Sequence, residues 1–166
     1  MKLIKKLPLS HYVIYSIVIF VGIVLDQLTK WLSVSFLKPL DTFPLIRGVL
    51  HLTYVENRGA AFGMLANHRW VFMVVSTVTI VAIGIALFSG HIDGFRYGVC
   101  LSAIISGGIG NMIDRIALGY VVDFIDFRLI NFAVFNGADA FVCVGAGFMI
   151  LFLVLDIVKE AKEGKK

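Results

Sequence analysis

Four long apolar runs constrain this chain more than any other feature of its sequence. The clearest extends from Trp70 to Ser89 and contains no charged residue. An α-helix rises about 1.5 Å per residue, so about 20 apolar residues cross a hydrocarbon core about 30 Å thick. The runs predict four membrane-spanning helices, at residues 12–36, 70–89, 97–113 and 137–155. The expected fold class is an all-α membrane protein, with one domain over residues 1–166.

Composition and charge agree with a membrane protein. The sequence is 59% hydrophobic, whereas an ordinary soluble domain is about half apolar. The first apolar run follows a basic segment, as in a secretory signal, but no A-x-A cleavage site follows it, so we expect it to be retained as the first span. Basic residues gather near both ends of the chain, which is typical of cytoplasmic tails beside anionic lipid and not of a nucleic-acid-binding surface. Four spans and this bias place both termini in the cytoplasm. These basic residues are Lys2, Lys5, Lys6, Lys159, Lys162, Lys165 and Lys166.

The segment between the first two spans, residues 38–69, is too polar and too rich in proline and glycine to cross a bilayer. Within it, Leu50, Leu52 and Tyr54 alternate with His51 and Thr53, which is the period of a half-buried strand. We therefore expect a small extracytoplasmic sheet on the membrane surface. The segment 114–136 is expected to be an extracytoplasmic catalytic loop. Its aromatic residues fit either anchors at the membrane interface, which is their usual role, or a lid.

Several polar residues lie beside the apolar runs, at positions that the predicted topology brings to one side of the membrane. Ionisable groups near lipid are costly, and they are usually paired or functional. We therefore predict a polar site at the outer membrane interface. Its expected members are Asp26, Asn57, Asn111, Asp114, Asp123 and Asp139.

Paired carboxylates indicate the chemistry of this site. Two carboxylates in a low-dielectric site cannot both ionise cheaply, so one keeps its proton. Such a pair can deprotonate a water and protonate a carbonyl oxygen or leaving amine, as in aspartic proteases. Asp123 and Asp139 are the predicted pair, and Asp126, three residues from Asp123, is the competing candidate. A structural alternative is that Asn136 caps the fourth helix and Asp139 completes a capping box.

The Asp26/Lys30 pair and the two cysteines each have a purely structural interpretation. Asp26 and Lys30 have the i,i+4 spacing, which fits either a local ion pair with a snorkelling Lys30 or membership of the site. Cys100 and Cys143 lie in apolar runs, and the sequence contains no CxxC or HExxH spacing. We therefore predict no disulfide framework, no zinc site and no cofactor.

Five segments together resemble lipoprotein signal peptidase (signal peptidase II), the integral-membrane aspartic peptidase of bacteria. They are DQLTK at 26–30, NRGAAFG at 57–63, GGIGNMIDR at 107–115, VVDF at 121–124 and FNGAD at 135–139. The resemblance covers nearly the whole chain and implies four membrane helices with an extracytoplasmic β-cradle. It implies that the protein, in the bacterial cell membrane, cleaves diacylglyceryl-modified prolipoproteins just N-terminal to the lipidated Cys. We expect a monomer whose activity survives chelators and serine or thiol reagents.

The resemblance also implies roles for individual residues. Asp123 and Asp139 match the catalytic pair, and Asp114 matches a structural position. Gly137 and Ala140 depart from the family, which more often has a branched apolar residue and a serine there, and we expect only slight loosening. The positions that match residues supporting the site or holding the substrate backbone are Asp26, Lys30, Asn57, Gly107, Asn111, Arg115 and Asn136.

Three other classes of protein are alternatives to a signal peptidase. A proton-coupled transporter also carries Asp and Lys within the membrane, but here the charges cluster at one interface and do not line a path across it. A structural membrane adaptor would tolerate substitution of Asp123. An intramembrane serine peptidase is disfavoured, because the sequence has no GxSxG-type nucleophile elbow and no His in a polar motif.

Overall fold

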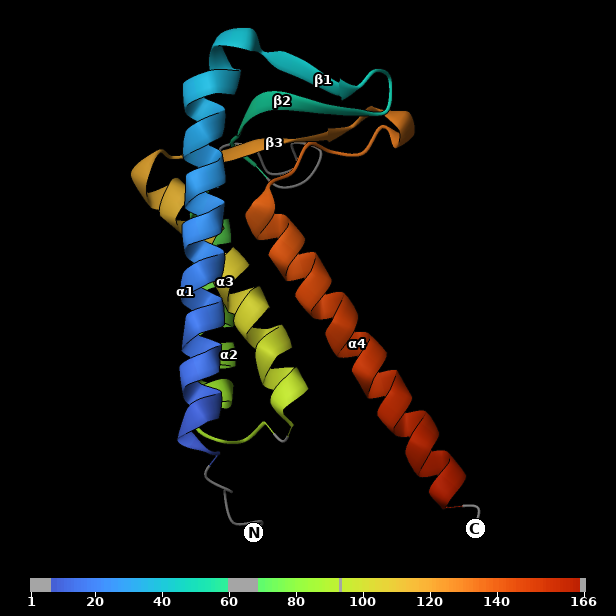
Figure 1. Ribbon diagram of the computed structural model, residues 1–166. Helices are drawn as coiled ribbons and strands as arrows, with labels where there is room; N and C mark the ends of the chain where they lie inside the picture. Colours follow the sequence, from blue (N-terminus) through green and yellow to red (C-terminus); the bar gives the residue numbers. More distant parts are fainter. Residues whose placement is uncertain (1–6, 60–68, 93, 165–166) are drawn as a thin grey trace.

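The computed structural model describes residues 7–59, 69–92 and 94–164. Over these residues the chain forms four long helices with a small sheet at one end of the bundle (Figure 1). Each helix is long and apolar enough to cross a membrane, which confirms the predicted fold class. The helices are α1 (Leu9–Leu32), α2 (Arg69–Phe88), α3 (Phe95–Ala117) and α4 (Gly137–Glu163).

Three of the helices, α1, α3 and α4, extend beyond the predicted spans. α1 begins at Leu9 and continues through one π-helical turn, Ser33–Leu37, and a short 3-10 turn, Lys38–Leu40. α4 ends at Glu163 and not near residue 155. Its last turns are rich in lysine and glutamate, which are good helix formers. Hydropathy therefore marks the part of a helix that is suited to lipid, and not the point at which the helix ends.

The sheet is antiparallel, with the strand order β1-β2-β3 in the described residues. Its strands are β1 (Thr42–Ile46), β2 (Leu50–Asn57) and β3 (Val121–Phe127). The first two strands confirm the expected sheet between α1 and α2, and Gly48, with φ of +74°, turns the chain between them. The third strand lies in the segment expected to be a loop, so the loop assignment was wrong there. The first residues of that segment, up to Ala117, belong to α3.

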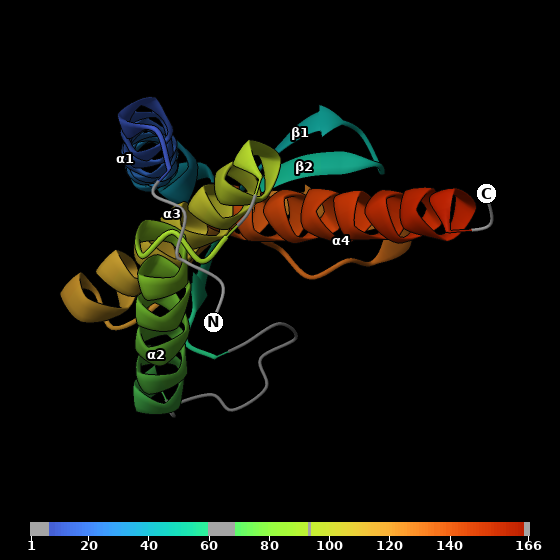
Figure 2. The same cartoon turned by 90° about the horizontal axis from the view of Figure 1, so that it is seen from below.

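The bundle is organised around α3, which packs between the other helices (Figure 2). Small residues allow neighbouring helices to approach closely. A Cβ on Gly22 would lie 2.5 Å from the Ser106 hydroxyl oxygen, and one on Gly145 would lie 2.8 Å from the Cys100 carbonyl oxygen. α1 and α4 are therefore each held against α3 by a glycine contact.

The two ends of the bundle differ (Figure 1). At the sheet end, the sheet extends over the first turn of α4. At the opposite end, α1 begins and α4 finishes. Some predictions fall outside the described residues: the part of the 38–69 region at 60–68, the matching residues 60–63 of one motif, and the lysines at positions 2, 5, 6, 165 and 166.

Candidate active site

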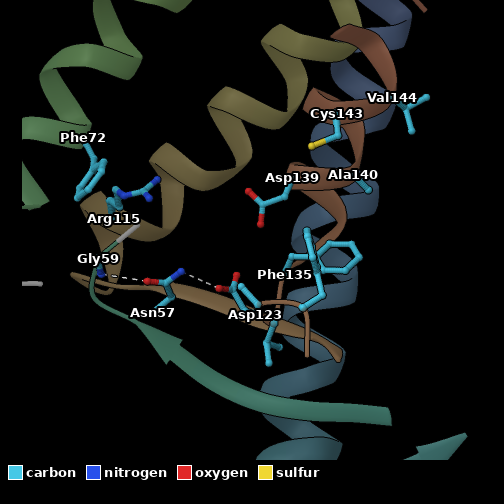
Figure 3. A pocket seen from close by; sticks show the side chains of 13 residues that line it. Asn57, Gly59, Phe72, Arg115, Asp123, Phe135, Asp139, Ala140, Cys143 and Val144 are labelled. Atoms are coloured by element: carbon cyan, nitrogen blue, oxygen red, sulfur yellow. Dashed lines mark hydrogen bonds between the residues drawn. The ribbon is translucent and has the colours of Figure 1, made fainter. Parts of the chain in front are cut away.

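Asp123 and Asp139 come from different elements and line the same cavity. Asp123 lies in the middle of β3, and Asp139 lies in the first turn of α4. The cavity has a volume of about 630 Å³, and both carboxylates point into it (Figure 3). The remaining lining residues are Asn57, Gly59, Phe72, Arg115, Phe132, Ala133, Val134, Phe135, Ala140, Cys143 and Val144.

Asn136 connects the two aspartates. Its side-chain amide donates to Asp123 Oδ1 at 2.6 Å, and its backbone N–H donates to Asp139 Oδ2 at 3.2 Å. The backbone N–H of Asp139 donates in return to Asn136 Oδ1 at 3.0 Å, which completes a capping box at the start of α4. The capping alternative is therefore confirmed, and it does not compete with the site. The cap itself brings Asp139 to Asp123.

Two further asparagines donate to the remaining carboxylate oxygens. Asn57 Nδ2 lies 2.8 Å from Asp123 Oδ2. Asn111 Nδ2 lies 2.8 Å from Asp139 Oδ1. Each of the four carboxylate oxygens thus accepts one N–H. Hydrogen bonds of this kind favour the charged form of a carboxylate and oppose the effect of burial.

The orientation of each asparagine amide is fixed by a group that can only donate. Gly59 N–H donates to Asn57 Oδ1 at 3.0 Å, and Lys30 Nζ donates to Asn111 Oδ1 at 2.9 Å. For Asn136, the donor is the backbone N–H of the capping box. Because a backbone N–H and an ammonium have no acceptor, each amide oxygen must face its donor. The amide nitrogens are then directed at the aspartates.

Lys30 does not snorkel to the interface. It is 3% exposed and lies between two carboxylates, at 2.9 Å from Asp26 and 3.1 Å from Asp114. The local ion pair and the connection to the site therefore both exist, because the same ammonium also contacts Asn111. A buried ion pair is costly to break, because removing one partner leaves the other charge uncompensated.

Asp26 and Asp114 also hold the elements that carry the paired aspartates. Asp26 Oδ1 accepts from the backbone N–H of Ala138, in the first turn of α4, at 2.9 Å. Asp114 Oδ2 accepts from the backbone N–H of Val122, beside Asp123, at 3.0 Å. These two contacts tie the start of α4 and β3 to the helix bundle.

Gln27 is a member of this network that the sequence analysis did not single out. Its amide nitrogen lies 3.0 Å from Asp114 Oδ1, 3.2 Å from Asp26 Oδ2 and 3.2 Å from the Gly110 carbonyl oxygen. The available signal was its place beside Asp26 in the DQLTK segment. A neutral glutamine in an apolar helix, next to a buried charge, is a candidate for the same network.

Gly107 acts through packing. A Cβ at this position would collide with the Ala138 carbonyl oxygen, so only glycine lets the first turn of α4 pack this closely on α3. A Cβ on Gly110 would likewise collide with the Asp26 carboxylate. Gly107 is therefore near the site without lining the cavity.

Arg115 lies on the cavity wall at the end of α3. Its Nη1 donates to the Asn111 carbonyl oxygen at 3.3 Å, and its guanidinium carbon lies 5.3 Å from the centre of the Phe72 ring. Arg115 thus contacts a backbone carbonyl near the end of α3 and also lines the cavity.

Asp126 lies in the same strand but in a different environment. Its Oδ2 accepts from Thr53 at 2.6 Å and from Arg128 at 2.9 Å. Burial acts to raise the pKa of Asp126, but these hydrogen bonds and the Arg128 charge together hold it below its usual value. Asp126 therefore has its own partners and does not line the described cavity.

Asp123 has the opposite electrostatic character. Burial, and to a smaller extent the nearby Asp139 carboxylate, raise the pKa of Asp123 to about 6. The hydrogen bonds from Asn57 and Asn136 oppose this rise. A carboxyl group with such a pKa can hold a proton or release it near neutral pH, as general acid–base chemistry requires.

The other reactive groups are placed as follows. Cys100 is buried and Cys143 is exposed, and both are free thiols. Cys143 lines the cavity, one turn after Asp139. His51 accepts a hydrogen bond from the Gly48 backbone N–H at 3.2 Å. Within the described ranges, no three His, Cys, Asp or Glu side chains are grouped closely enough to bind a metal ion.

Comparison with known proteins gives a consistent family. The family model described as Signal peptidase (SPase) II matches residues 18–155. A lipoprotein signal peptidase of Caldanaerobacter subterraneus subsp. tengcongensis is 49% identical over 146 residues, covering 84% of this chain and 94% of the relative. One from Clostridioides difficile is 46% identical over 144 residues, covering 85% and 95%. A bacterial membrane enzyme solved by the in meso method at 2.3 Å resolution is 29% identical, with a TM-score of 0.79, and the match covers 86% of this chain and 88% of that one.

Proposed function

The chain belongs to the signal peptidase II family, a family of bacterial multi-pass membrane peptidases that remove signal peptides from lipoproteins, and we propose that Asp123 and Asp139 perform the cleavage. The observation that carries this proposal is the shared cavity. Two aspartates from separate elements line it, and Asn136 is hydrogen bonded to both. Membership of a peptidase family also argues against the transporter and adaptor alternatives.

The proposed reaction is hydrolysis of one peptide bond by an activated water. One aspartate removes a proton from the water while the oxygen attacks the scissile carbonyl carbon. The other aspartate protonates the leaving amine as the tetrahedral intermediate collapses. Arg115 and Asn57, which both line the cavity, supply donors for substrate carbonyl oxygens, where negative charge develops. No metal takes part in the proposed mechanism.

The proposed cleavage position is just N-terminal to the lipidated Cys of a diacylglyceryl-modified prolipoprotein. The form of the cavity supports it, because the polar aspartates share the space with apolar side chains such as Phe132, Phe135 and Val144. Val144 is 56% exposed on the outer surface of α4, where lipid would lie. A substrate could therefore extend its acyl chains into lipid while its peptide reaches the carboxylates.

We further propose that the sheet end faces the outside of the cell and that both termini are cytoplasmic. The lysines near the end of α4 and Arg96 at the start of α3 support this orientation, because basic residues favour the cytoplasmic side. Fusing a reporter that is active only outside the cytoplasm to either terminus would test it. Activity of that reporter at the C-terminus would reverse the proposed topology.

The decisive experiment is cleavage of a lipidated prolipoprotein by purified wild-type, Asp123→Asn, Asp139→Asn and Asp126→Asn proteins. We expect the first two substitutions to abolish cleavage and the third to leave most of it, because Asp126 bonds Thr53 and Arg128 instead of lining the cavity. Each variant is first checked for folding by thermal unfolding in detergent. Cleavage by folded Asp123→Asn or Asp139→Asn protein would reject the pair. Inhibition by EDTA would reject the metal-free mechanism.

A further inference from the structure

We infer that the two aspartates have fixed and different roles: Asp139 is the base that deprotonates the water, and Asp123 is the acid that holds a proton in the resting enzyme and gives it to the leaving amine. This inference rests on the proposed function of the same site. It follows from the different surroundings that α4 and β3 give to two chemically identical side chains.

Asp139 lies where a negative charge is favoured. It occupies the third position of α4, and the amino-terminal end of a helix carries a partial positive charge. A backbone N–H at that end donates to one of its oxygens. Its other oxygen accepts from Asn111, whose amide is in turn held by the Lys30 ammonium. Hydrogen bonds from a helix terminus and from a lysine-polarised amide both stabilise the carboxylate form.

Asp123 lies where a negative charge is disfavoured. It is 1% exposed and lies in the middle of a strand, not within the first turn of a helix. Its two donors are the neutral side-chain amides of Asn57 and Asn136. Burial is the largest influence on this carboxyl group, and it raises the pKa to about 6 in spite of these donors.

The charged groups of the surrounding elements reinforce the difference. The Asp139 carboxylate of α4 disfavours a negative charge on Asp123, whereas the Lys30 ammonium of α1 favours a negative charge there. From α3, the Arg115 guanidinium attracts both carboxylates, and its interaction with Asp139 is the larger. Asp114, also of α3, is already paired with Lys30. The neighbouring strand β2 contributes the neutral Asn57.

The fixed amides also determine where the proton of Asp123 can point. Asn57 and Asn136 both present N–H to the carboxyl group, because their amide oxygens accept from backbone N–H groups. Neither amide can turn to accept the proton without breaking that bond. The O–H of Asp123 is therefore left to point into the cavity, where the leaving amine of a bound substrate would lie.

The test is the pH dependence of kcat/KM for cleavage of a lipidated prolipoprotein. For an acid–base pair this profile is bell-shaped: its acidic limb reports the base and its alkaline limb reports the acid. Asn57→Ala removes a donor that lowers the pKa of Asp123, so that pKa rises. We expect the alkaline limb to move to higher pH by about one unit, with the acidic limb unchanged.

Thr53→Val is the matched control. It lies on the same strand as Asn57 and removes a 2.6 Å hydrogen bond to the other aspartate of β3, Asp126. We expect it to move neither limb. A shift of the acidic limb in Asn57→Ala would show that Asp123 is the base and would overturn the inference. Two unmoved limbs would overturn it too, because Asp123 would then not be the acid whose titration is observed.

A second measurement covers the case in which Asn57→Ala does not fold. The carboxyl ¹³C resonances of aspartate-labelled wild-type protein report titration directly, and the Asp123 resonance is identified by its loss in Asp123→Asn. We expect Asp123 to titrate near pH 6, and titration at the ordinary aspartate value of about 4 would overturn the inference. Failure of the proposed function is distinguishable, because folded Asp123→Asn or Asp139→Asn would then still cleave substrate.

Discussion

Charged side chains join α3 to a neighbouring helix at both ends of the bundle, to α1 at the sheet end and to α4 at the opposite end, and the two junctions differ in burial. At the sheet end, Lys30 and its partners Asp26 and Asp114 are each at most 4% exposed in their side chains. At the opposite end, Arg96 of α3 pairs with Asp156 of α4, and these side chains are 43% and 39% exposed. Water and salt screen the exposed pair. Only the buried network can impose a single arrangement on the groups that it contacts.

The largest expected effect comes from removing the buried cation. Lys30→Met leaves Asp26 and Asp114 buried without their partner and should lower the free energy of unfolding by about 3–5 kcal/mol. The matched variant at the opposite end, Arg96→Met, should change it little. Thermal unfolding of both variants in the same detergent measures the difference. Equal losses would show that burial does not distinguish the two ends.

A smaller effect is expected from filling a close contact between helices. Gly107→Ala places a methyl group against the Ala138 carbonyl oxygen at the sheet end and should cost about 1–3 kcal/mol. Gly147→Ala, on the same helix as Ala138, meets nothing within 4 Å and should stabilise the protein by about 0.5 kcal/mol. Unfolding temperatures compare the two. If both variants were equally stable, the close packing of α4 on α3 would not constrain the sheet end.

The smallest effect on stability is expected from substituting Cys143. This variant tests the sheet end of the bundle through cleavage activity instead of stability. Cys143→Ala changes an exposed side chain on the cavity wall, so fold and cleavage should both be retained. Because the Cys143 thiol lines the cavity, we no longer expect activity to survive thiol reagents of every size. A bulky maleimide on Cys143 should block the cavity in wild-type protein and have no effect on Cys143→Ala. Blocking of both proteins would place the sensitive thiol elsewhere.

The sequence was sufficient for the features that depend on hydropathy and on topology. Apolar runs predict the four helices, and the alternation of spans brings Asp26, Asn57, Asn111, Asp123 and Asp139 to one end. The structure adds what depends on contacts between distant segments. The strand β3 was missed because its two aspartates interrupt an otherwise apolar, β-branched and aromatic sequence. Their burial depends on donors from other elements, which no local pattern encodes.

Lys30 and the asparagines show the same limit at the level of single side chains. A lysine at i,i+4 from an aspartate usually reaches solvent, and only the packing of α3 against α1 encloses this one. The sequence also cannot state which end of an asparagine amide faces a neighbour. That direction is determined by the Lys30 ammonium and by backbone N–H groups, which become neighbours only in the folded chain.

The origin of the sheet has a consequence for the order in which the protein is made. β2, which carries Asn57, precedes α2 and α3 in the chain, whereas β3, which carries Asp123, follows them. A growing chain therefore presents β2 with one unpaired edge until two more helices have been inserted and β3 has emerged. Asp139 arrives later still. A partly synthesised chain therefore lacks the proposed catalytic pair until the first turn of α4 has been made.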